Sequence, residues 1–122
     1  MMTGTVNAAL EGTLLLTVFD NGNHSHVVPV FIDTGFTGEL TLPPAFVAVL
    51  GLLWIGRQHA MLADGTVQII DVYAATVMWD GRQRHIEVDA VNAHLLGMSM
   101  LENHELRIEV VSGGNVTVLD LP

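Results

Sequence analysis

The chain has 122 residues, enough for one domain spanning 1–122 but not for two hydrophobic cores joined by a linker. Half of its residues are hydrophobic and 14 % are charged, which excludes a disordered chain, because disorder combines low hydrophobicity with high net charge. Four basic residues against thirteen acidic ones give a net charge of −9, which disfavours nucleic acid as a partner, since phosphate binding needs positive charge.

Pairs of turn-forming residues divide the chain into short apolar runs. Asn21-Gly22, Asp64-Gly65, Asp80-Gly81 and Gly113-Gly114 supply residues that tolerate positive φ, as tight hairpin turns require. Between these turns lie runs rich in Val, Ile, Leu and Thr, and some of them alternate apolar with polar residues as half-buried strands do. We therefore expect an all-β domain of hairpins, with strands over residues 13–19, 26–32, 58–63, 66–79, 84–91, 106–111 and 116–121.

Two segments depart from the strand pattern and predict short helices. Pro43-Pro44 precedes the apolar run 45–53, where proline suits the first helical turn and Gly51 stands near the end. Residues 94–102 predict a second short helix with its leucine and methionine side chains on one buried side. Pro29, inside an expected strand, indicates an edge position or a bulge there.

The chain is more hydrophobic than a small soluble domain needs, which leaves a membrane span or an interface with another chain as explanations. The longest apolar run, Phe46 to Ile55, has about half of the ~20 residues that a span requires, and Gly51 interrupts it. Residues Met1 to Gly4 contain no basic residue and do not resemble the start of a signal peptide. We therefore expect a cytoplasmic protein with no membrane partner, whose excess apolar surface is buried in an oligomer.

The sharpest local feature is Asp33-Thr34-Gly35, which follows the apolar run Val30 to Ile32. Such a strand carries the Asp33 carboxylate to its end, where Gly35 turns the chain and a cleft can form above. The other interpretation of an isolated Asp-Thr-Gly is an ordinary strand-turn in which the aspartate accepts hydrogen bonds from local amides.

In chain order, Asp33-Thr34-Gly35, the Ala63-Asp64-Gly65 hairpin tip and Leu95-Leu96-Gly97 resemble the signatures of the retropepsin-like aspartic proteases. The segment Phe31 to Pro43 is similar to the small single-domain aspartic proteases of bacteria. The resemblance extends from about Gly12 to Leu121. It implies the acid-protease (retropepsin-like) fold, a small closed barrel with one or two short helices, in a two-fold symmetric dimer.

The resemblance implies a catalytic role for Asp33, supplied once by each subunit. It also implies that Thr34 braces the paired loops across the dimer axis and that Gly35 lets the backbone lie flat beneath the two carboxyls. Phe36 stands where retroviral enzymes usually carry alanine, which changes the pocket expected just beyond the catalytic turn. The residues implied to line or cover the substrate site are Phe36, the flap tip Ala63, Asp64 and Gly65, and Leu96 and Gly97 beside the catalytic loop.

In an aspartic protease, one carboxylate is the base that activates the attacking water, and a second, protonated carboxyl is the acid. The chain contains one Asp-Thr-Gly and no second Asp-Ser-Gly or Asp-Thr-Gly. If it is an enzyme of this kind, two chains must each supply Asp33 across a two-fold axis. The sequence therefore predicts an aspartic endopeptidase that is a homodimer, acts on a peptide or protein substrate and uses no cofactor.

Other chemistries have weaker support. His24 and His26 share one face of a strand and could offer two metal ligands, but the sequence supplies no evident third ligand and no HExxH helix, so no metal site is expected. The absence of Cys, and of any Ser within Gly-x-Ser-x-Gly, argues against cysteine and serine hydrolases. The main alternative is a non-proteolytic dimerisation or peptide-binding module of the same fold. A barrel that binds a small apolar ligand would need an enclosed cavity within one chain.

Overall fold

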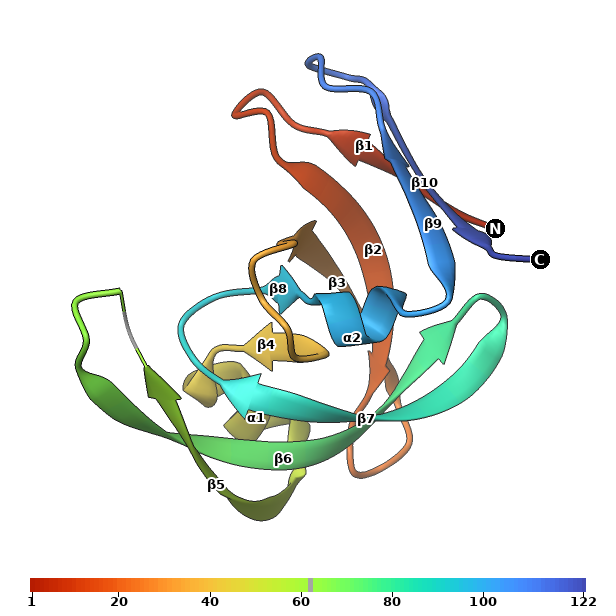
Figure 1. The fold of residues 1–122 in the computed structure, drawn as a ribbon. Helices are drawn as coiled ribbons and strands as arrows, with labels where there is room; N and C mark the ends of the chain where they lie inside the picture. The colour runs from red at the N-terminus through yellow and green to blue at the C-terminus, as the bar shows by residue number, and fades with distance from the viewer. Residues whose placement is uncertain (62) are drawn as a thin grey trace.

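The computed structural model describes residues 1–61 and 63–122, which form ten β-strands and two short α-helices (Figure 1). All ten strands belong to one mixed sheet, so the prediction of a mainly β domain with short helices is confirmed. The elements are β1 (Met2–Val6), β2 (Gly12–Phe19), β3 (Ser25–Ile32), β4 (Leu40–Leu42), α1 (Pro44–Leu50), β5 (Leu53–Met61), β6 (Val67–Trp79), β7 (Arg82–Ala90), β8 (Leu95–Leu96), α2 (Met98–Leu101), β9 (His104–Ile108) and β10 (Asn115–Asp120).

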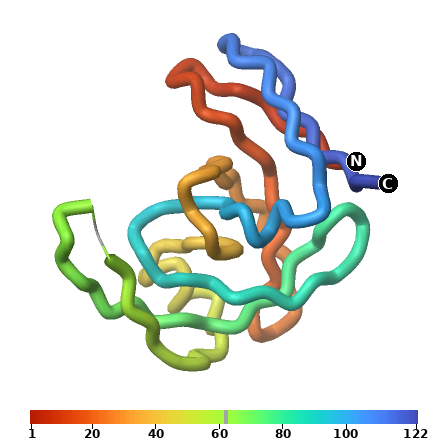
Figure 2. Tube along the Cα trace, viewed as in Figure 1, coloured from red at the N-terminus to blue at the C-terminus, as the bar shows by residue number. Residues whose placement is uncertain are grey.

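Six of the strands form a partial ring around the main core. Strand β2 pairs with β3, β3 with β8, β8 with β4, β4 with β7 and β7 with β6, and β6 pairs back to β2. Strand β5 extends the sheet at one edge, and β1, β10 and β9 continue it beyond β2 at the other. The β5–β6 hairpin therefore projects from one side of the ring, while the terminal strands lie on the other side with both chain ends (Figures 1 and 2).

Alternation along the strands decides which side chains enter the core. Leu16 of β2 stands opposite Val28 of β3 and both are buried, whereas the adjacent Leu15 is exposed. Strand β7 alternates in the same way, with Ile86 and Val88 buried, as its sequence pattern predicts. Burial of each such side chain contributes about 1.5–3 kcal/mol, so the alternation determines the face that packs inward. The largest fully buried side chains are Leu40, Leu42, Leu50, Leu96, Met100, Val18, Val30, Val77, Val88, Val116 and Val118.

The first helix is shorter than predicted. Helix α1 begins at Pro44, as expected, but Gly51 adopts a left-handed φ of 63° and ends it. Leu53 already belongs to β5, so the predicted helical extension to residue 53 is wrong, and β5 starts before the strand that was expected over 58–63. Position 62, inside that expected strand, lies outside the described residues.

The prediction of a helix over 94–102 is wrong in its first part. Leu95–Leu96 form β8, which pairs in parallel with β3 and antiparallel with β4. The buried Thr41 hydroxyl supports this strand, because it accepts the N–H of Leu95 and donates to the carbonyl of Ala93, both at 2.8 Å. Only Met98–Leu101 are helical. The two leucines thus gain a place in a buried ladder whose partners lie far away in the chain.

Strands β1 and β4 have no counterpart among the predicted elements. Both are short and depend on partners from distant parts of the chain: β1 pairs with β10 as well as with the neighbouring β2, and β4 pairs with β7 and β8. Strand β9 ends at Ile108, before the predicted end at 111, where the turn towards β10 begins. Neither helix that the structure describes is long and apolar enough to cross a membrane.

Candidate active site

Asp33 lies in a tight turn directly after β3. Its backbone N–H donates to the carbonyl of Leu96 at 3.0 Å, and its carbonyl accepts the N–H of Phe36 at 3.1 Å. Its carboxylate Oδ1 accepts the N–H of Gly35 at 2.9 Å, and the side chain is partly buried. These contacts hold a carboxylate at the end of an inner strand. The bond from Gly35 is equally expected of an ordinary strand-turn, so the environment of this turn has to decide between the two interpretations.

The turn after Asp33 interlocks with the segment that begins α2. A Cβ atom at Gly97 would stand 2.1 Å from the carbonyl oxygen of Gly38 and 2.6 Å from the Phe36 ring. A Cβ atom at Gly38 would stand 2.5 Å from the same ring. Phe36, the residue that departs from the retroviral pattern, therefore packs against two glycines whose lack of side chains makes room for it.

Backbone hydrogen bonds join the same two segments. The N–H of Gly97 donates to Glu39 at 2.9 Å, that of Met98 to Phe36 at 2.8 Å, and that of Ser99 to Gly38 at 3.2 Å. The Ser99 hydroxyl also donates to the carbonyl of Thr37. The Asp-Thr-Gly and Leu-Leu-Gly stretches, which are far apart in the sequence, are thus joined into one structural unit. We call residues 33–38 together with residues 95–99 the Asp33 unit.

The surface of this unit carries small groups beside the carboxylate. Thr34 is exposed, whereas Leu96 is fully buried beneath the turn. A Cβ atom at Gly35 would come within 3.3 Å of Asp33 Oδ1, closer than most real Cβ contacts, so glycine there leaves the carboxylate uncrowded. Thr34 and Gly35 are therefore both exposed to solvent on the outer side of the Asp33 turn.

The Ala63-Asp64-Gly65 tip joins β5 to β6, and all three residues are exposed. Gly65 has a φ of 84°, which favours glycine, and Asp64 Oδ1 accepts both the N–H of Thr66 at 2.9 Å and its hydroxyl at 2.6 Å. The Thr66 hydroxyl, followed by the Thr66 amide, lowers the pKa of Asp64 below its usual value. The hydrogen bonds found among the described residues do not join this tip to the Asp33 turn.

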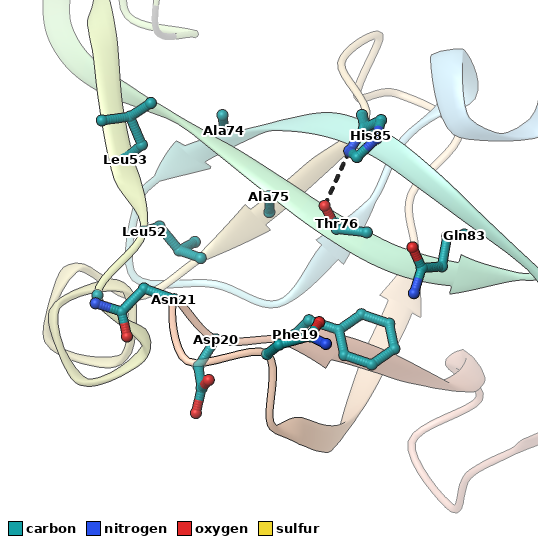
Figure 3. Close-up of a pocket in the computed structure, with 12 residues that line it drawn as sticks. Phe19, Asp20, Asn21, Leu52, Leu53, Ala74, Ala75, Thr76, Gln83 and His85 are labelled. Carbon is teal, nitrogen blue, oxygen red and sulfur yellow. Dashed lines mark hydrogen bonds between the residues drawn. The ribbon is translucent and has the colours of Figure 1, made fainter.

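A cavity of about 580 Å³ opens beside the turn that joins β2 to β3 (Figure 3). Asp33 follows the other end of β3. None of the residues expected at the active site lines it. Its polar wall includes the Thr76 hydroxyl, which is 2.9 Å from Nδ1 of His85. The lining residues are Phe19, Asp20, Asn21, Asn23, Gly51, Leu52, Leu53, Ala74, Ala75, Thr76, Gln83 and His85.

The histidines considered as metal ligands lie next to a carboxylate. His26 Nε2 is 2.9 Å from Asp20 Oδ2, and His24 Nδ1 is 3.4 Å from Asp20 Oδ1. The hydrogen bond from His26 is the largest cause that lowers the pKa of Asp20 to about 2. Within residues 1–61 and 63–122, no group of three His, Asp or Glu side chains has an arrangement that could hold a metal ion.

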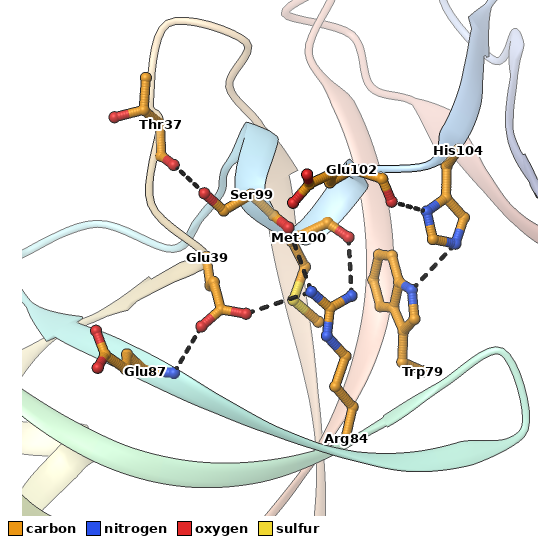
Figure 4. Close-up of polar contacts among 9 residues, drawn as sticks. All are labelled: Thr37, Glu39, Trp79, Arg84, Glu87, Ser99, Met100, Glu102 and His104. Carbon is orange, nitrogen blue, oxygen red and sulfur yellow. Dashed lines mark hydrogen bonds and ion pairs between the residues drawn. The ribbon is translucent and has the colours of Figure 1, made fainter.

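Two residues that contact the Asp33 unit, Arg84 and Glu39, were not among the predicted site residues (Figure 4). The Arg84 guanidinium bonds to Glu39 and to α2. A signal for it was present in the sequence: in the alternation of β7, Arg84 has the same phase as the inward residues Ile86 and Val88. An arginine at an inward position is expected to have specific partners, because an unpaired buried charge is costly.

The site therefore offers the Asp33 carboxylate, which lies in a turn that a distant segment supports. One carboxylate can accept or donate a proton, but it cannot do both at once. No protein-family model, curated protein or solved structure matches the chain. The features of the chain that point to a function are therefore the geometry of this turn and the sequence motifs that it brings together.

Proposed function

We propose that this chain is an aspartic endopeptidase of the retropepsin-like type, which acts as a homodimer with one Asp33 from each subunit. The observation that carries the proposal is the interlock between the Asp33 turn and the Leu96-Gly97 segment. An ordinary capped turn needs only hydrogen bonds from its own amides. This turn is also hydrogen-bonded to a second segment, both at its start, where Asp33 bonds to Leu96, and at its end, where Glu39 bonds to Gly97. The partial ring, with β3 parallel to β8, supports the acid-protease fold because it brings two of the three family signatures into contact.

The proposed chemistry needs two carboxyls at the dimer axis. Two such groups about 3 Å apart cannot both ionise, so they share one proton and titrate as a pair. The ionised Asp33 takes a proton from a bridging water, which attacks the peptide carbonyl, while the neutral Asp33 of the partner subunit protonates the carbonyl oxygen. Activity is therefore expected on the acidic side of neutral and is lost when both carboxyls are ionised.

The β5–β6 hairpin is proposed to cover the substrate. Strand β5 is an edge strand, and the hairpin exposes the large apolar residues Met61, Val67 and Ile69. An extended peptide can pair with strand edges through its backbone while apolar pockets select its side chains. Closure of the hairpin tip over the bound peptide would exclude bulk water from the reaction.

The test measures cleavage of an unfolded protein at acidic pH, with and without pepstatin, together with the mass of the particle in solution. Asp33→Asn is expected to remove cleavage by at least about a hundredfold while the dimer persists, because the amide cannot serve as the base. The matched control is Asp120→Asn, an exposed aspartate of β10, which is expected to retain activity. An active Asp33→Asn variant, or a wild-type chain that stays monomeric at high concentration, would contradict the proposal.

The alternative is a non-proteolytic dimerisation or peptide-binding module of the same fold. It is favoured by the position of the large cavity, which lies away from Asp33. Such a module would bind peptides without cleaving them, and its binding would survive Asp33→Asn. Peptide affinity measured on that variant, beside cleavage by the wild type, distinguishes the two functions.

A further inference from the structure

Arg84 connects three parts of the molecule that lie far apart in the sequence. Its Nη1 donates to the carbonyl of Met100 at 3.0 Å, and its Nη2 donates to the carbonyl of Ser99 at 3.2 Å and to Glu39 Oε2 at 3.3 Å. The guanidinium carbon also lies 5.7 Å from the centre of the Trp79 ring. Figure 4 shows the side chain reaching from β7 towards α2, with the Glu39 carboxylate beside it. The planar fork of arginine allows one side chain to bind several acceptors at once.

Glu39, at the end of the Asp33 turn, is the partner of Arg84 and forms two further hydrogen bonds. Its second carboxylate oxygen, Oε1, accepts the backbone N–H of Glu87 at 3.0 Å, and its own carbonyl accepts the N–H of Gly97. The Arg84 and Glu39 side chains are only 30 % and 23 % exposed, so solvent screens this pair less than it screens a fully exposed pair. The last residue of the turn before β4 is thus attached to β7 and to the segment that precedes α2.

These contacts attach the Asp33 unit to strand β7 of the ring. The turn bonds to residues 97–99. Arg84 donates to the carbonyls of Ser99 and Met100, and Glu39 accepts a backbone N–H of β7. Among the described residues, neither side chain forms a hydrogen bond or ion pair with Asp33 itself. Their effect on the carboxylate therefore passes through the backbone of the turn.

We propose that Arg84 and Glu39 are positioning residues for Asp33: their ion pair holds the turn and α2 against β7, so that the carboxylate keeps the orientation needed to meet Asp33 of the partner subunit. The catalytic consequence rests on the proposed function. A shared proton requires the two carboxyls to approach within hydrogen-bond distance, and misplacement by about 1 Å can cost two orders of magnitude in rate.

The experiment compares Glu39→Gln, Arg84→Met and the double variant with wild type. Both single changes are expected to lower kcat by about 10- to 100-fold with little change in KM, because neither side chain is placed at the substrate. The double variant should be no slower than Arg84→Met, since both changes remove one shared connection. NMR of the Gly35 amide and the Asp33 carboxyl carbon supplies a readout that does not depend on activity, and both signals should shift in the variants.

Arg107→Met is the matched control. Arg107 also pairs with a glutamate, Glu105, at 3.0 Å, but this pair is exposed on β9 and has no contact with the Asp33 turn among the described residues. If Arg84→Met does not fold, Glu39→Gln decides alone, because it keeps the size of the side chain and an acceptor for Glu87. The positioning role is overturned if kcat and the Gly35 and Asp33 signals of Glu39→Gln match those of Arg107→Met. An inactive wild type would instead refute the proposed function, and the NMR signals would then decide the positioning role by themselves.

Discussion

The Asp33 turn and the tip of the β5–β6 hairpin are both turns that follow strands, but they are supported in opposite ways. A second segment supports the Asp33 turn through backbone bonds, close glycine contacts and the buried Leu96. The hairpin is supported mainly by its own ladder, and near its tip Met61, Val67 and Ile69 are 77 %, 57 % and 61 % exposed. Under the proposed function this difference has a reason: Asp33 has to approach its counterpart to within hydrogen-bond distance and needs rigid support, whereas a hairpin that covers a substrate has to open.

The base of the hairpin differs from its tip. Trp54 Nε1 and Arg57 Nε both donate to Asp71 Oδ1 at 3.1 Å, across the irregular pairing between Trp54 and Gly56. The hydrogen bond from Trp54, followed by that from Arg57, lowers the pKa of Asp71 below its usual value. The hairpin is therefore cross-linked where it leaves the ring, and the contrast with the Asp33 turn is greatest towards the tip.

Among changes to these two turns, Gly97→Ala is expected to lower the stability of the protein most. The added methyl group would collide with the Gly38 backbone and the Phe36 ring, which should lower the free energy of unfolding by roughly 2–4 kcal/mol. Urea denaturation measures the loss. Gly12→Ala is the control, since a Cβ atom there would meet its nearest neighbour at an ordinary 3.4 Å. Equal stability of the two variants would show that the glycine interlock does not support the turn.

Asp89→Asn is expected to have a smaller effect on stability. Asp89 lies in β7, between Val72 of β6 and Thr41 of β4. Burial, followed by the charges of Glu87 and Glu39, raises the pKa of Asp89 against an opposing hydrogen bond from Gln58. A raised pKa means that folding disfavours the ionised form, and this destabilisation is present at neutral pH and disappears as the carboxyl becomes protonated. Asp89→Asn is therefore expected to raise the Tm by roughly 1–3 °C at pH 7 and by less at acidic pH.

Thermal unfolding as a function of pH tests this expectation. Glu102→Gln removes one charge from an exposed position and is the matched control. A benefit of Asp89→Asn that is the same at every pH, or that the control reproduces, would contradict the assignment of the effect to the burial of Asp89.

The smallest global effect is expected from Asp64→Ala at the hairpin tip. The change removes the acceptor for both hydrogen bonds from Thr66, but the residue is exposed and the turn lies outside the core. The Tm should stay nearly constant, while the amides of β5 and β6 near the tip should exchange several-fold faster with solvent. Acidification should loosen the wild-type tip in the same way, because a lowered pKa means that the contribution of Asp64 is lost when its carboxylate is protonated. Unchanged exchange in Asp64→Ala would show that the tip does not depend on this turn.

Local patterns predicted the hairpins well and their connections less well. The turn dipeptides located the β6–β7 hairpin, where Asp80 and Gly81 both have positive φ, as the sequence pattern required. The alternation in β7 correctly identified its buried face. The tandem proline and Gly51 located α1, but they did not show that Leu53 would already be part of a strand.

Within the candidate site, the sequence pointed to Asp33 and the family resemblance pointed to Leu96 and Gly97, which support its turn, but neither indicated Glu39 or Arg84. The apolar run before Asp33 was enough to place it at the end of a strand, since strand polarity and turn chemistry are local properties. Glu39 had no local signal. Arg84 had only the phase of its position in β7, which indicated an inward arginine without indicating a partner.

The sequence by itself determined a mainly β fold, the positions of most strands, and a carboxylate at the end of an apolar strand. Only the tertiary structure decided that Leu95–Leu96 form a strand beside β3, that Gly97 fits against Gly38, and that Arg84 reaches Glu39. The physical reason is that these arrangements are stabilised by burial and hydrogen bonding with partners distant in the chain. Local propensity and periodicity carry no information about the free energy of such contacts, because the contacts form only when the distant segments come together in the ring.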